Sequence, residues 1–255
     1  MLKTKREDWK LTMRIRNLVA IGAVSAMAFT ASAATTYVNE TFESYADTAA
    51  MQVNWGSAGA GTLDTAFGNP GQSATHPGGA VNVWTGSSFS LLPSSGAIVL
   101  SADIYDPGTG PAQRNTVGLR NGANPLFEMG HYNSQGSQYA VRLVAMYGNP
   151  NWVFFPNVTR TAGWHHYEAT FTATDVTITL DLNNDGIVDS TLNYSGSPSA
   201  NPFVDLRFGG PSGNSSAGPM WVDNIMLSQI PEPSVAMLGL LGGLGMLWIA
   251  RRRNV

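Results

Sequence analysis

We predict that residues 34–229 fold as an all-β domain, an antiparallel β-sandwich. An N-terminal signal helix should precede this domain, and a C-terminal transmembrane helix should follow it. Three observations support this. Between Thr35 and Gln229, short β-branched and aromatic runs alternate with Gly, Pro, Asn and Ser. No stretch there sustains an amphipathic helix over three turns. Longer apolar runs lie near the two ends, at 18–29 and 235–250. Many short strands at about ten-residue spacing are typical of a sandwich.

The expected strands follow one another along the domain. Side chains in Tyr167–Phe171 alternate between apolar and polar, as on a half-buried strand. The strand that begins at Ala97 should end at the Asp106-Pro-Gly turn. The predicted strands are Ala97–Tyr105, Tyr139–Tyr147, Trp164–Ala173, Val176–Leu182, Phe203–Phe208 and Met220–Leu227.

The charge distribution excludes one class of partner. Only 12% of the 255 residues are charged, against about a quarter in an average soluble domain. Residues 34–229 hold five bases, all arginine, against 14 acids, a net charge of −9. Such a domain has no basic surface for phosphate backbones, so we expect no nucleic-acid binding. The chain has no cysteine, which excludes disulfides and thiolate metal sites.

The N-terminus has the order of a secretory signal peptide. A basic segment beginning at Met13 precedes the apolar run 18–29 and then Ala31-Ser-Ala33. We predict a signal peptide over residues 1–33, cleaved between Ala33 and Ala34. Translation is expected to start at Met13, because the first twelve residues are unusually charged. The alternative is an uncleaved membrane anchor, for which the apolar run is short.

The C-terminus, residues 230–255, has three parts in order. Pro231, Glu232 and Pro233 precede the apolar run 235–250, and Arg251, Arg252 and Arg253 follow it. Sixteen helical residues span roughly 24 Å, slightly less than a hydrocarbon core of about 30 Å. The arginines should stay cytoplasmic, which places the domain outside. An ordinary tail anchor is the alternative.

These three parts resemble the PEP-CTERM sorting signal of Gram-negative bacteria. The resemblance implies that an exosortase, a membrane transpeptidase-like enzyme, recognises the Pro-Glu-Pro and removes the tail. The chain would then use the secretion machinery, reside transiently in the inner membrane, and end at the cell surface or outside the cell. The family is associated with exopolysaccharide production.

The domain is similar to the concanavalin A-like (LamG-type) jelly roll. The resemblance rests on the opening Asn39–Tyr45, on Gly163–Phe171 followed by a hairpin over Val176–Asn193, and on the closing strand Trp221–Leu227. It implies that the closing strand pairs beside the first strand of the domain.

One segment has the front of a calcium loop. Asp181, Asn183 and Asp185 alternate before Gly186, and Asp189 falls at the ninth position. However, Leu192 stands where a bidentate Glu is required. A β-hairpin turn capped by the same side chains is the other interpretation. Both stay open, and calcium is the one cofactor considered.

The sequence has few candidates for catalysis. His165 and His166 are adjacent, so on a strand they point to opposite faces, and His76 and His131 are isolated in the sequence. Asp103 and Asp106 are close in sequence but should only end a strand. Residues 34–229 contain no Glu-x-Asp-x-x-Glu, no Gly-x-Ser-x-Gly and no P-loop. We therefore predict a protein that is not an enzyme.

Aromatic side chains on loops are the candidates for stacking on sugar rings. They are Trp152, Trp84 and Tyr132, with Trp152 the best placed beside Asn-Pro-Asn, although such residues also fill sandwich cores. We expect a non-catalytic surface or extracellular-matrix protein that binds extracellular polysaccharide or serves structurally. The alternatives are a polysaccharide-active enzyme of unfamiliar motif and a calcium-stabilised structural adhesin.

Overall fold

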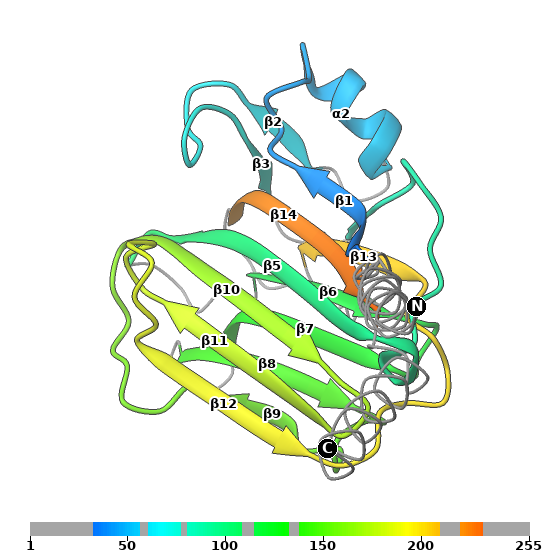
Figure 1. Ribbon diagram of the computed structural model, residues 1–255. Coiled ribbons are helices and arrows are strands. Elements are labelled where there is room, and N and C mark those ends of the chain that lie inside the picture. The colour runs from blue at the N-terminus through cyan, green and yellow to red at the C-terminus, as the bar shows by residue number, and fades with distance from the viewer. Residues whose placement is uncertain are drawn as a thin grey trace, which may run out of the picture. The chain divides into compact units, whose positions relative to one another are not determined.

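The computed structural model describes residues 33–56, 61–77, 81–108, 115–132, 138–209 and 220–231, all within the compact unit Ala33–Ala236. Their strands form two antiparallel sheets that pack as two layers (Figure 1). Sheet A contains, in spatial order, β12 (Ser190–Ser195), β11 (Asp175–Asp181), β10 (Gly163–Phe171), β5 (Ala97–Asp106), β14 (Met220–Ile230), β3 (Ser73–His76) and β2 (Thr62–Asp64). β1 (Thr35–Glu40) also pairs with β14.

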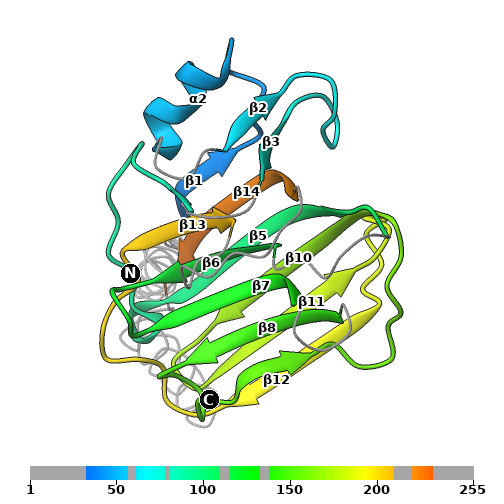
Figure 2. The same cartoon turned by 180° about the vertical axis from the view of Figure 1, so that it is seen from behind.

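Sheet B is the second layer and lies in front in the view from behind (Figure 2). It contains β4 (Asn82–Val83), β13 (Asp205–Gly209), β6 (Asn115–Arg120), β7 (Leu126–Tyr132), β8 (Gln138–Val144) and β9 (Asn151–Phe154). An antiparallel β-sandwich is therefore confirmed for the described part of the chain.

The core lies between the two sheets and is rich in aromatic rings. On β10 the inward positions His165, Tyr167, Ala169 and Phe171 are buried, while the positions between them are only half-buried. Phe171 contacts Phe127 of sheet B in a T-shaped arrangement, with ring centres 4.8 Å apart. This alternation follows from the two-residue period of a strand.

One short helix packs at the end of the sandwich near β1. Helix α2 (Thr48–Trp55) begins after Asp47, whose carboxylate caps it by accepting from the backbone N–H of Ala50. Trp55 is fully buried and donates through Nε1 to the buried Glu40 of β1. A 3₁₀ turn, η1 (Pro93–Ser95), precedes β5.

The predicted strands and pairings are found with small shifts. The closing strand, β14, pairs antiparallel with β1, and β11 pairs with β12 as the expected hairpin. The strand predicted over Tyr139–Tyr147 ends at Val144, because the backbone turns where Ala145 takes a positive φ of 60°. Phe203 forms an isolated bridge with Leu91 instead of starting a strand.

The predicted terminal segments fall mostly outside the described residues. This applies to the signal helix, to Ala31, and to the tail from Glu232 onward, including the transmembrane helix over 235–250. Within the described ranges, no helix has both the length and the hydropathy needed to cross a bilayer.

Candidate functional site

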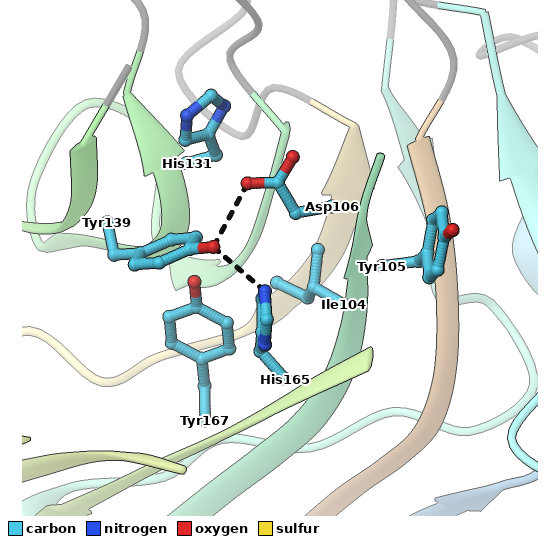
Figure 3. A pocket seen from close by; sticks show the side chains of 7 residues that line it. All are labelled: Ile104, Tyr105, Asp106, His131, Tyr139, His165 and Tyr167. Carbon is cyan, nitrogen blue, oxygen red and sulfur yellow. Dashed lines mark hydrogen bonds between the residues drawn. The ribbon is translucent and has the colours of Figure 1, made fainter. Parts of the chain in front are cut away.

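A small pocket lies between the sheets at one end of the sandwich (Figure 3). The Tyr139 hydroxyl donates to Oδ2 of Asp106 at 3.1 Å and lies 2.8 Å from Nε2 of His165. The pocket is lined by Ile104, Tyr105, Asp106, His131, Tyr139, His165 and Tyr167, with the ring of Tyr105 turned away from the others. It has room for about one water molecule, which is too little for a sugar ring.

One residue that lines this pocket, Asp106, forms an ion pair with Arg160. Arg160 holds Asp106 with two nitrogens, at 2.8 Å from Nε to Oδ2 and 2.7 Å from Nη2 to Oδ1. Burial favours a higher pKa for Asp106, but hydrogen bonds from Arg160 and the backbone of Gly108 outweigh it and lower the pKa. The carboxylate therefore stays ionised and orients Tyr139. We interpret the pocket as a structural network.

Two carboxylates meet on the outer face of sheet A. Asp103 of β5 and Asp223 of β14 stand directly opposite each other, and they are 2% and 0% exposed. Asp103 accepts hydrogen bonds from the side chains of Asn69, Asn184 and Asn224 and pairs with His166 Nδ1 at 2.6 Å.

The electrostatics of this pair favour one bound proton. Burial raises the pKa of Asp223 to about 7, and the charge of Asp103 adds to the rise. The hydrogen bond to Asp103 raises the pKa of His166, whose side chain is one-third exposed. Aromatic rings adjoin the pair, since Phe67 packs against Trp164 and Trp221. Both carboxylates are nonetheless closed off from solvent.

The outer face of sheet B carries a row of side chains that crosses five strands. These side chains alternate with core residues and therefore point away from sheet A. Cross-strand pairing aligns Arg207 (β13), Gly118 (β6), Glu128 (β7), Arg142 (β8) and Trp152 (β9). The neighbouring row consists of four small residues and one aromatic residue on the last strand. They are Gly209, Thr116, Gly130 and Ala140, followed by Phe154.

Arg142 contacts three neighbours at the β9 end of the row formed by Arg207, Gly118, Glu128, Arg142 and Trp152, here called the charged row. Its Nη1 lies 3.7 Å from Oε1 of the fully buried Glu128, and its Nε donates to Oδ1 of Asn151 at 2.9 Å. Its guanidinium carbon lies 5.7 Å from the ring centre of Trp152, in cation–π geometry. Trp152 is half-buried, so a partly solvent-accessible indole stands beside a fixed cation.

Of the predicted stacking residues, the structure therefore brings Trp152 to a partly solvent-accessible position on the outer face of sheet B. Trp84 packs edge-on against the buried Trp55, with ring centres 5.0 Å apart, at the margin of the core. Tyr132 ends β7, and its side chain lies outside the described residues.

The histidines and β5 aspartates occupy distinct sites. His165 points into the sandwich and His166 points out, as predicted. Asp103 and Asp106 likewise face opposite sides of sheet A. The inward face of β7 brings His131, which is isolated in the sequence, into the pocket that holds His165.

The Asp181 segment forms the turn between β11 and β12. Asp181 accepts from the backbone N–H groups of Asn183, Asp185 and Gly186, at 3.1, 3.2 and 2.7 Å. Asp189 accepts from Leu182 N–H at 2.7 Å. Among the described residues, no three His, Cys, Asp or Glu side chains converge as a metal site would require. The carboxylates thus cap a hairpin turn, and calcium remains a prediction.

The predicted processing residues are described only in part. Ala33 and Ala34 are exposed at the start of the described chain, and Pro231 is half-buried at its end. Ala31, Glu232, Pro233, Arg251, Arg252 and Arg253 lie outside the described residues.

Comparison with known proteins identifies the fold. No known family matches the sequence, and no curated protein matches it. Among solved structures, the chain is similar to a carbohydrate esterase from the Shiga toxin-encoding bacteriophage phi24B, with a TM-score of 0.51 and 13% identity over 77% of this chain and 99% of that one. It is also similar to the T. cruzi calreticulin globular domain (TM-score 0.48, 12% identity, 83% and 95% covered). A third is the cellulose-induced protein Cip1 (0.44, 15%, 74% and 96%). The likeness to the esterase extends over almost all of that chain and shows a shared sandwich fold.

Proposed function

We propose that this chain is an exported protein whose β-sandwich binds glycan without catalysing a reaction, through the outer face of sheet B. The observation that carries the proposal is the half-buried Trp152 held beside Arg142, next to the row of small residues. A flat indole presents an apolar surface to a sugar ring, while the cation and the asparagine fix polar groups. The neighbouring small residues are themselves buried, so the part of this face that a sugar can reach is the edge formed by Trp152 and Arg142.

A glycan array probed with the full chain in detergent tests this proposal. Replacement Trp152→Ala should weaken binding by about tenfold or more, because a tryptophan often carries much of the binding energy of an interface. Trp164→Ala is the matched control, since Trp164 is also a half-buried tryptophan, on the outer face of sheet A. Equal binding by the two variants would place the ligand elsewhere. Silence across all glycans would favour a structural role.

Export and sorting belong to the same proposal. The basic, apolar and small-residue order at the N-terminus and the Pro-Glu-Pro, apolar and arginine order at the C-terminus support it. Intact-mass analysis of the product from Gram-negative cells with and without an exosortase is the test. A mature chain that starts at Ala34 and lacks the tail is expected only when the exosortase is present.

A polysaccharide-active enzyme is the second candidate, favoured by the carboxylate pair Asp103 and Asp223. Glycosidases use two carboxylic groups with unequal pKa values. The burial of both groups opposes this role, because a substrate must reach them. Release of reducing ends from any glycan on the array, abolished by Asp223→Asn, would establish it.

A further inference from the structure

The arginines of the domain are not spread evenly. Residues 34–229 contain five arginines and no lysine. Three of them, Arg120, Arg142 and Arg207, lie on the outer face of sheet B. Arg160 is paired with Asp106. Sheet B therefore carries most of the positive charge of a domain whose net charge is −9.

The acidic groups on this face do not outnumber the arginines. Glu128 lies within reach of Arg142, and Asp205 accepts from Nη2 of Arg207 at 2.7 Å. Among the described residues of this face, three guanidinium groups thus stand with these two carboxylates. Arg120 and Arg207 lie on adjacent strands of this face, because Arg120 stands opposite Asp205 and Arg207 stands opposite Gly118, so two cations are held close together.

Arg207 is only partly covered by the protein. Its Nη2 binds Asp205 and its Nε is buried, so a ligand would meet the exposed end of the guanidinium, which belongs to a side chain that is 20% exposed. A guanidinium fork matches a planar carboxylate, which can take two parallel N–H···O bonds. Side chains of Arg207 and Arg142 are 20% and 24% exposed, so a ligand group can reach both.

We propose that the outer face of sheet B selects an acidic glycan, one whose sugar rings carry uronic-acid carboxylates. The carboxylates bind Arg207 and Arg142 across the sheet, and a ring of the same chain stacks on Trp152. The negative charge of the rest of the domain repels the polymer and confines it to this face. This selection rests on the proposed glycan binding and specifies its ligand class.

Calorimetry with the full chain in detergent tests the selection. The probes are an oligogalacturonate, its methyl ester and a neutral cello-oligosaccharide of equal length. The acidic probe should bind at least about tenfold more tightly than its ester, because the ester removes the charge and leaves the sugar backbone unchanged. The affinity should fall as salt is raised.

Variants then locate the carboxylate contacts. Arg207→Gln should weaken the acidic probe by about tenfold or more and leave the neutral probe unchanged. Thr191→Glu is the matched control, since it makes the same change in net charge at an exposed position on sheet A. Arg207→Lys should restore part of the affinity, because it keeps the charge without the fork.

The outcomes separate the two proposals. Equal affinity for the acid and its ester, or equal loss in Arg207→Gln and Thr191→Glu, overturns the selection while glycan binding stands. Equal affinity for a sulfated oligosaccharide overturns the choice of carboxylate. Absence of binding to every probe overturns the selection, and silence across the glycan array as well overturns both proposals.

Discussion

Removing one partner of the ion pair between Asp106 and Arg160 should be among the most destabilising single replacements in this fold, because it leaves a buried charge without a counter-ion. Replacement Asp106→Asn keeps the shape of the side chain and removes its charge. It leaves the guanidinium of Arg160 without a counter-ion in a site where the two side chains are only 5% and 14% exposed. The amide introduced by this replacement has one acceptor oxygen, whereas the carboxylate offers two to Arg160, Tyr139 and Gly108.

The magnitude follows from this burial. Breaking a buried, hydrogen-bonded pair by removing one partner costs about 3–5 kcal/mol, whereas an exposed pair contributes about 0–1 kcal/mol. With a urea dependence of about 2–3 kcal/mol per molar for a domain of this size, the midpoint should fall by about 1–2 M. Asp205→Asn is the control, since the Arg207–Asp205 pair is 20% and 29% exposed. It should shift the midpoint by less than about 0.5 M.

Urea unfolding followed by tryptophan fluorescence measures both variants. The double variant Asp106→Asn with Arg160→Met should be more stable than Asp106→Asn alone, because it removes the stranded charge. A loss below about 1 kcal/mol for Asp106→Asn, or a double variant less stable than the single one, would refute the reasoning.

Three further predictions concern other parts of the fold. The pKa of Asp223 is raised in the folded state, so between about pH 4 and pH 7 the folded protein holds a proton that the unfolded chain releases. The free energy of unfolding should therefore fall by about 3 kcal/mol from pH 4.5 to 7.5, measured relative to the Asp223→Asn variant. A difference between the two proteins that does not change with pH would contradict this. Gly118→Ala places a Cβ 2.1 Å from the backbone oxygen of Phe127, so it should lower the free energy of unfolding by about 2 kcal/mol or more in the same assay. No change in that free energy would show that the two strands can move apart to admit the methyl group. Chelation with EDTA should change the melting temperature by less than about 1 °C, because backbone N–H groups already donate hydrogen bonds to the Asp181 carboxylate. A clear drop in the melting temperature would support calcium binding at this turn.

The sequence predicts the strands best where a two-residue alternation is strong. Tyr167–Phe171 and the hairpin after Val176 were placed within a residue or two, because their inward positions are large and apolar. The short strands β2, β4 and β9 were not predicted, since two to four residues carry too little periodicity to stand out. Their place in the sheets is set by the neighbours that they pair with.

The candidate site was predicted only at its edge. Trp152 was singled out from its loop context, but nothing near it in the sequence points to Arg207, which is brought to the same row by four strand pairings. The carboxylates of Asp103 and Asp223 are 120 positions apart and meet through the register of β5 and β14. Contacts of this kind depend on strand order, and local propensity carries no information about strand order.

The register that creates the charged row is itself held by the core. Leu206 and Phe208 flank Arg207 and are fully buried, and Phe127 and Met129 flank Glu128 in the same way. A slip of one residue on either strand would turn these apolar side chains to solvent and the charged one into the core, at a cost of several kcal/mol. Packing between the sheets therefore fixes which charges align on the outer face. For this reason a ligand-binding row can be assembled from residues that share no local sequence signature.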